Sequence, residues 1–300
     1  MTKSIRLLIK DPVEMDQEVH VIVTSMFPDF DFSEYEQALF DAERLFSGSM
    51  EGFERCDTQY HDWAHTMGAL LATARLLHGV HIDRQELSPR TVNRTLIAAL
   101  FHDAGYIRRT GESNGSGAQF TKSHVQRGID LLEEYTDKQQ WSVSGFLDME
   151  SMIQCTDPAR SPDTIVFTNI ETMLAAHVLA TADIISQMAD DIYLEKLPFL
   201  FLEFTEGGIT DFTSEYDLFM KTMGFYAFMR SKMEGRLSNT IASMSTHFKE
   251  RHSVDRDFYS EAAQRNMQYL VTIIEKYGEE YSKGLRRQLD REEFPVKVAA

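Results

Sequence analysis

Residues 58–66 read TQYHDWAHT and combine side chains that can carry chemistry at a regular spacing. His61 and His65 lie four residues apart, so on a helix both would project from one face. Imidazole nitrogens bind transition metals and also exchange protons near neutral pH. We therefore expect this segment to lie at the centre of a functional site.

Two later segments supply the same kinds of side chain. His102 and Asp103 directly follow an apolar run that ends at Phe101, and Asp183 lies inside the apolar segment 170–188. Burying a carboxylate is costly unless it is paired or binds a cation. Each residue alone could be an ordinary core or helix-end residue. Their order on successive segments predicts that they converge on a hydrolytic metal site.

Apolar residues recur at the helical period along nearly the whole chain, and we find no alternating pattern typical of strands. The 300 residues contain only seven prolines and sixteen glycines. The pattern predicts an all-α, multi-helix bundle in a single domain, 1–300. Its metal-site core would span about 56–190, and a C-terminal helical part would span about 191–300.

The expected helices cover residues 13–27, 33–47, 62–78, 89–101, 142–155, 170–188, 192–206, 213–232, 233–249 and 257–277, with another beginning at Ser123–His124. Ser88 and Pro89 form a helix-start signal, and Gly79 is the predicted cap at the end of the helix that follows His61. The charged tail after Gly284 is expected to fray.

The segment 110–118 is rich in turn-forming residues, reading TGESNGSGA. It follows the His-Asp pair and could be a mobile flap beside the site or a plain surface loop. Arg108 and Arg109, just before it, could contact a substrate phosphate or face solvent.

Composition excludes several functions. The net charge of −17 argues against binding to nucleic acid or to an anionic membrane surface. No apolar run is long enough to span a membrane, and no signal peptide is recognised, so the cytoplasm is the expected compartment. The two cysteines, Cys56 and Cys155, form neither a disulfide framework nor a metal-binding pair. The hydrophobic fraction of 43% suffices for a sizeable core.

These motifs together resemble the HD-domain superfamily of metal-dependent phosphohydrolases. Residues 60–65, YHDWAH, are similar to the Tyr-His-Asn-x-x-His motif of class I cyclic-nucleotide phosphodiesterases, with Asp62 in place of the Asn. Residues 100–103, LFHD, resemble the defining His-Asp pair. Residues 123–132, 153–157 and 182–184 resemble, in order, the next histidine-bearing helix, the Ile-x-x-Thr-Asp segment and the Ala-Asp-Leu that carries the last ligand. After the His-Asp pair, Ala104-Gly105-Tyr106 stands where the phosphodiesterases have another histidine.

The resemblance implies a role for each matched residue and a bundle like that of the phosphodiesterases. The implied ligands of a divalent metal are His65, His102, Asp103 and Asp183. His61 would protonate the leaving oxygen, and His124 would contact phosphate or a second metal, unless it is only a helix-start histidine. One or two ions are implied, and Zn, Fe, Mn, Co, Mg and Ni are not distinguished.

The function that this resemblance implies is hydrolysis of a small-molecule phosphoester, a nucleotide or cyclic-nucleotide phosphodiester, by metal-activated water. A non-catalytic nucleotide- or metal-binding module on the same fold is the alternative. A purely structural helical scaffold is a third reading, in which the histidines and Asp183 bind no metal.

Overall fold

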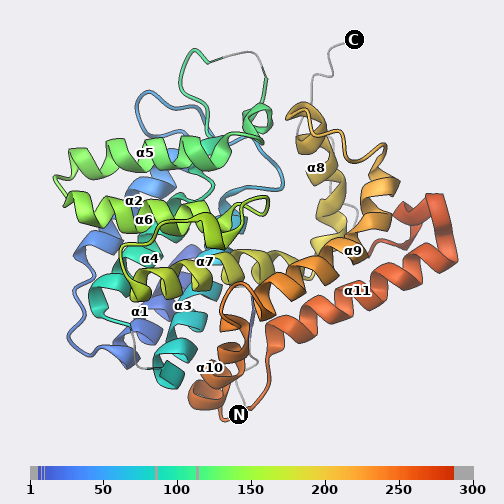
Figure 1. The fold of residues 1–300 in the computed structure, drawn as a ribbon. Coiled ribbons are helices and arrows are strands. Elements are labelled where there is room, and N and C mark those ends of the chain that lie inside the picture. The colour runs from blue at the N-terminus through green and yellow to red at the C-terminus, as the bar shows by residue number, and fades with distance from the viewer. Residues whose placement is uncertain (1–5, 8, 10, 85–86, 113–114, 287–300) are drawn as a thin grey trace.

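The computed structural model describes residues 6–7, 9, 11–84, 87–112 and 115–286, and the predicted tail lies outside them from residue 287 on. Figure 1 shows a fold built of helices. They are α1 (Pro12–Met26), α2 (Ser33–Ser47), α3 (Trp63–Arg84), α4 (Pro89–Phe101), α5 (His124–Lys138), α6 (Val143–Thr156), α7 (Ile170–Met188), α8 (Tyr193–Glu206), α9 (Glu215–Glu234), α10 (Ser243–His252) and α11 (Phe258–Tyr277). Within this part of the chain, β pairing is limited to one isolated bridge between Phe53 and Arg109. The all-α prediction is confirmed.

Helices α3 and α7 form the centre of the bundle and pack against each other. Residues 65–80 of α3 and 174–186 of α7 are buried without interruption. A helix that is buried on all sides must be covered by other helices, and α1, α4 and α10 pack on α3 while α4, α6 and α11 pack on α7. The candidate residues on these two helices therefore lie in the core.

Local signals set several helix starts. Ser88 accepts a hydrogen bond from the backbone N–H of Thr91, and Pro89 is the first residue of α4, as predicted. Asp11, Ser142 and Asn169 cap α1, α6 and α7 in the same way. A side-chain cap of this kind contributes about 1 kcal/mol to helix stability.

The predicted end of α3 at Gly79 is wrong, because the helix continues to Arg84. Gly79 instead lies where α10 crosses α3: a Cβ atom at this position would stand 1.9 Å from the carbonyl oxygen of Ser243. The predicted helix 233–249 is also wrong. The chain turns after Glu234, with positive φ angles at Ser238 and Asn239, and α10 begins only at Ser243.

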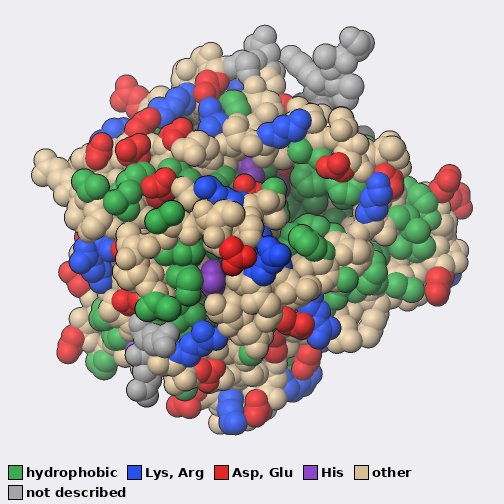
Figure 2. Space-filling view, in the orientation of Figure 1, with side chains coloured by type: hydrophobic (Ala, Val, Ile, Leu, Met, Phe, Trp, Pro, Cys, Tyr) green, Lys and Arg blue, Asp and Glu red, His purple; other side chains and the backbone are tan. Residues whose placement is uncertain are grey.

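Helices α8, α9 and α11 lie together at one side of the molecule, on the right in Figure 1. Helices α9 and α11 pack on each other and on α7, so this part of the chain is tied to the central helix. Figure 2 shows hydrophobic side chains gathered on this side, where α9 exposes Met220, Phe225 and Phe228. None of the described helices is long and apolar enough to cross a membrane.

Because two buried histidines resist protonation, we expect the protein to lose stability in acid. His78 and His177 are 3% and 5% exposed. Burial lowers the pKa of each to about 4, helped at His78 by the positive charge of Arg251. Unfolded histidine takes up its proton at a pKa of about 6.5, so between these values the unfolded chain binds more protons than the folded one. The free energy of unfolding should therefore fall with decreasing pH, by about 1.4 kcal/mol per pH unit for each histidine.

Urea unfolding across this pH range checks the expectation. His78→Gln and His177→Gln should each make the free energy of unfolding less dependent on pH than in the unaltered protein, by about one proton. If neither substitution changed the pH dependence of the free energy of unfolding, other groups would be the cause of the acid sensitivity.

Candidate metal centre

Four side chains predicted as ligands meet between α3, α4 and α7. Nε2 of His65 lies 3.3 Å from Nε2 of His102, 3.0 Å from Oδ2 of Asp103 and 3.2 Å from Oδ1 of Asp183. Nε2 of His102 lies 3.2 Å and 3.5 Å from the same two carboxylate oxygens. All four residues are buried, with at most 8% of each exposed. His65, His102 and Asp183 form a cluster that could hold a metal ion.

The donor set fits a divalent cation. Ligand bonds of about 2.1 Å place neighbouring donor atoms about 3.0 to 3.4 Å apart in octahedral or tetrahedral coordination, close to the spacing of this cluster. Oδ2 of Asp103 is buried and accepts no hydrogen bond from the described residues, although two imidazole nitrogens lie nearby. A buried carboxylate oxygen without a hydrogen bond is costly, and a cation would satisfy it.

Surrounding groups orient the candidate ligands. Nδ1 of His102 lies 2.8 Å from the carbonyl oxygen of Ala99, so it carries the proton and leaves Nε2 free to bind. Gln187 donates from Nε2 to Oδ1 of Asp183 and accepts from the hydroxyl of Tyr60. These contacts fix the ring of His102 and the carboxylate of Asp183 before any ion binds.

The cluster is held together electrostatically. Burial opposes protonation of His65, but the hydrogen bonds that the protonated ring would donate to Asp103 and Asp183, together with the negative charges of these carboxylates, raise its pKa to about 9. The same carboxylates raise the pKa of His102 against burial, and burial of the two carboxyl groups is outweighed by the imidazoles, which lower their pKa values. Protons on the imidazoles thus compensate the two buried carboxylates in the absence of a cation.

His61 lies just before the helix that carries His65, as the expected helix 62–78 implies, so the two histidines do not share one helix face. Helix α3 begins at Trp63, because Oδ1 of Asp62 accepts the N–H of His65 at 2.8 Å and so caps the helix start. The His61 ring still lies near the cluster, with its centroid 5.7 Å from that of His65.

Glu203 on α8 holds His61 in place. Its Oε2 lies 2.7 Å from Nδ1 of His61, and its Oε1 accepts the backbone N–H groups of Gln59 and Tyr60 at 2.8 and 2.6 Å. Glu203 is only 4% exposed. One carboxylate therefore fixes both the imidazole and the loop that carries it.

His124 lies at the edge of the cluster. Its Nδ1 lies 2.7 Å from the carbonyl oxygen of Thr121, and its Nε2 lies 3.7 Å from Oδ1 of Asp103. The buried ring of Tyr106 stacks on both His61 and His124, with centroids 4.7 and 4.5 Å away. Burial lowers the pKa of His124, which keeps a nitrogen available as a ligand or acceptor.

Close backbone packing brings His124 to this position. A Cβ on Gly105 would lie 1.9 Å from the carbonyl oxygen of His124, and one on Gly128 would lie 3.1 Å from that of Phe101. The two glycines let the turn after Asp103 and helix α5 approach each other.

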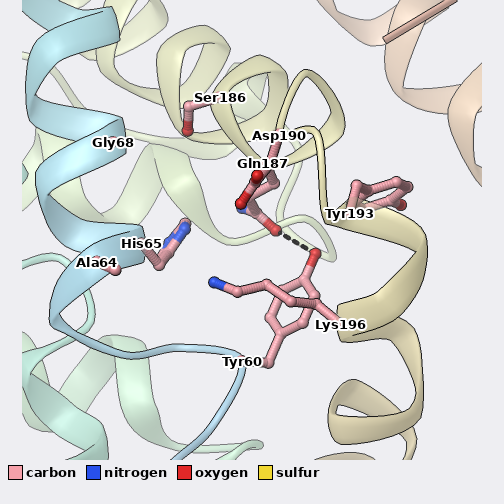
Figure 3. A pocket seen from close by; sticks show the side chains of 9 residues that line it. All are labelled: Tyr60, Ala64, His65, Gly68, Ser186, Gln187, Asp190, Tyr193 and Lys196. Carbon is pink, nitrogen blue, oxygen red and sulfur yellow. Dashed lines mark hydrogen bonds between the residues drawn. The ribbon is translucent and has the colours of Figure 1, made fainter. Parts of the chain in front are cut away.

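A small cavity adjoins His65 (Figure 3). Residues of α3, α7 and α8 line it, together with Asp190 between α7 and α8 and Tyr60 before α3. Its volume of about 20 Å³ holds about one water molecule. Gly68, one turn beyond His65, forms part of the wall, and its lack of a side chain leaves room beside the imidazole. Figure 3 shows the side chain of Lys196 extending into this space toward His65.

Other predicted residues lie apart from the cluster. Arg108 pairs with Asp57 at 2.9 Å and Arg109 with Glu134 at 2.6 Å. The described part of the loop 110–118 is anchored, since Ser116 and Gly117 donate backbone N–H groups to Glu206 and Asp57. Residues 113–114 lie outside the described residues, so the flap stays a prediction. Both cysteines are free.

Sequence reasoning missed Glu203, Gln187 and Lys196. Glu203 had a usable signal: it is a lone carboxylate in the run LPFLFLEF, residues 197–204, and the same argument had singled out Asp183. Gln187 lies one turn after Asp183 and could have been found from that spacing. Lys196 has no signal of its own, because a single lysine near a helix start is common.

Comparison with known proteins yields one partial match. Residues 109–244 match the model of a family described as Npun_R2479-like. This segment is less than half of the chain. It contains His124, Asp183, Lys196 and Glu203 but begins after His61, His65, His102 and Asp103. No curated protein and no solved structure matches the chain.

Proposed function

We propose that the protein is a metal-dependent phosphohydrolase of the HD-domain type, which hydrolyses a phosphoester of a nucleotide or cyclic nucleotide. The observation that carries the proposal is the arrangement of His65, His102, Asp103 and Asp183 around one point, with His61 beside them but outside the cluster. Ligands and a separate, oriented proton donor are the parts that metal-assisted hydrolysis requires.

His65, His102, Asp103 and Asp183 would hold the cation. A bound divalent cation supplies an activated water and stabilises charge on phosphoryl oxygens. His124 is the candidate for an additional contact, either with phosphate or with a second ion, because its Nε2 faces Asp103. No particular metal is favoured by this nitrogen and oxygen donor set.

His61 is proposed as the general acid. Oε2 of Glu203 accepts a hydrogen bond from Nδ1–H of His61, which orients the ring. Nε2 of the protonated ring then carries the proton that the leaving oxygen needs. The phosphoester oxygen leaves as a hydroxyl, and the ring returns to the neutral form until solvent protonates it again.

A panel of phosphoesters tests the proposal. Cyclic nucleotides and nucleoside mono- and triphosphates would be incubated with the purified chain and Mn, Co, Mg or Zn. Hydrolysis that requires a cation and stops on chelation is the expected result. Bound metal without hydrolysis of any compound would favour the non-catalytic module, and no bound metal would favour the structural scaffold.

His61→Asn is expected to lower kcat by about a hundredfold or more while the metal content stays unchanged, because a general acid typically contributes this much to rate. Activity would be measured on the best substrate of the panel and metal content by elemental analysis. His177→Gln serves as the control, since His177 is also a buried histidine but bonds to Ser238 instead of facing the cluster. Full activity in His61→Asn would refute the acid role.

A further inference from the structure

We propose that Lys196 is a phosphate-binding residue of the candidate site, whose ammonium contacts a non-bridging phosphoryl oxygen of the substrate. This inference rests on the proposed function, because it assigns the residue that recognises the substrate's charge. It starts from the small cavity beside His65, into which the lysine side chain extends (Figure 3).

The ammonium of Lys196 is placed to accept a new partner. Only 14% of the side chain is exposed. Within the described residues its Nζ forms a single ion pair, 3.7 Å from Oδ1 of Asp62, which is too long for a direct hydrogen bond. The same oxygen already accepts the N–H of His65 at 2.8 Å. A lysine ammonium has three donors, so it retains hydrogen-bonding capacity that a phosphate can use.

The charges around the cavity explain why a lysine is needed. Asp62, Asp183 and Asp190 all lie at or next to it, in a chain with a net charge of −17. A phosphate group would be repelled by these carboxylates, so a cation in addition to the metal is required to balance it. Lys196 is the lysine or arginine that lines this cavity.

The lysine is also restrained in position. Its ammonium lies 6.0 Å from the centroid of the Tyr60 ring, which attracts cations weakly. Tyr60 is itself fixed by its hydrogen bond to Gln187 and by Glu203. In this conformation the cavity holds about one water. A phosphate would therefore have to draw the lysine away from Asp62 and replace Asp62 as the partner of the ammonium.

The alternative is that Lys196 only neutralises Asp62. Titration of the full chain with inorganic phosphate, in the presence of Mn²⁺ and with calorimetric detection, separates the two. Lys196→Met keeps the aliphatic stem but removes the ammonium. Because hydrogen bonds between charged groups are lost, phosphate binding should weaken about tenfold or more. Lys196→Arg should restore most of the affinity.

Asp62→Asn provides the second variant. Asparagine also caps helices well, so the start of α3 should be kept while the competing charge is removed. Phosphate should then bind about two- to fivefold more tightly. The gain should be much smaller when Asp62→Asn is combined with Lys196→Met, and a gain of equal size in that double variant would show that lost repulsion alone causes it.

Three outcomes would overturn the proposal: no phosphate binding in the unaltered protein, equal binding in Lys196→Met, or loss of Mn²⁺ in Lys196→Met, which would show that the lysine supports the metal cluster instead. Failure of the proposed function would look different. Phosphate binding would still depend on Lys196, but no phosphoester in the panel would be hydrolysed.

Discussion

Asp183→Asn is expected to reduce the affinity for a divalent cation by about a hundredfold or more and to abolish any hydrolysis that depends on it. The amide keeps the shape of the side chain and can still bond to Gln187, so the fold should survive. It removes one of the two negative charges in the cluster and replaces a strong oxygen ligand with a weak one. Equilibrium dialysis against Mn²⁺ or Zn²⁺, followed by activity assays, measures both effects.

Asp190→Asn is the matched control. Asp190 lines the same cavity and follows α7, the helix that carries Asp183, but it accepts the backbone N–H of Ile192 and lies outside the cluster. This variant should keep the metal. Equal metal affinity in Asp183→Asn and the unaltered protein would refute the assignment of Asp183 as a ligand.

Metal binding should also stabilise the protein, because the ion binds only the folded cluster. The thermal midpoint should rise with added cation in the unaltered protein and much less in Asp183→Asn. This comparison does not depend on knowing the substrate. It therefore tests the metal site even if the phosphoester panel fails.

Helix starts could be predicted from sequence where their determinants are local. The adjacent residues Ser88 and Pro89 are sufficient to predict the start of α4. The helical period of apolar residues in 170–188 is sufficient to predict α7. The prediction at Gly79 was wrong because this glycine packs against the backbone of Ser243 in α10, which is far away in the sequence. A glycine that ends a helix and one that lets another helix cross cannot be distinguished by local pattern.

The candidate ligands could be named from residue type and order, since buried carboxylates and histidines are rare without a partner. Their convergence is a property of the packing of α3, α4 and α7. The helix start between His61 and His65 is set locally, because Asp62, with His65 three residues later, is a helix-start signal that places His61 outside the helix. Glu203 contacts His61 across 142 positions, which no local pattern can reveal.

Gly105→Ala is expected to destabilise the protein by about 3 kcal/mol or more. The new Cβ would stand 1.9 Å from the carbonyl oxygen of His124 and 2.7 Å from the backbone nitrogen of Gly128. Both atoms belong to the backbone of α5, so the clash is relieved only if the helix moves away from the turn that follows Asp103. That movement would carry His124 away from Asp103 as well. Chemical denaturation measures the stability, and dialysis against Mn²⁺ measures the metal affinity.

Gly224→Ala isolates the steric cause. Gly224 lies within α9, where a Cβ would meet no atom within 4 Å, so alanine should stabilise the helix by about 0.5 to 1 kcal/mol. The two glycine-to-alanine changes are chemically identical, and opposite signs in their free energies of unfolding would trace the loss at Gly105 to the contact with α5. If Gly105→Ala were as stable as the unaltered protein, the close approach of α5 would not be needed for folding. Full metal affinity in a destabilised Gly105→Ala variant would show instead that the position of His124 does not matter to the cluster.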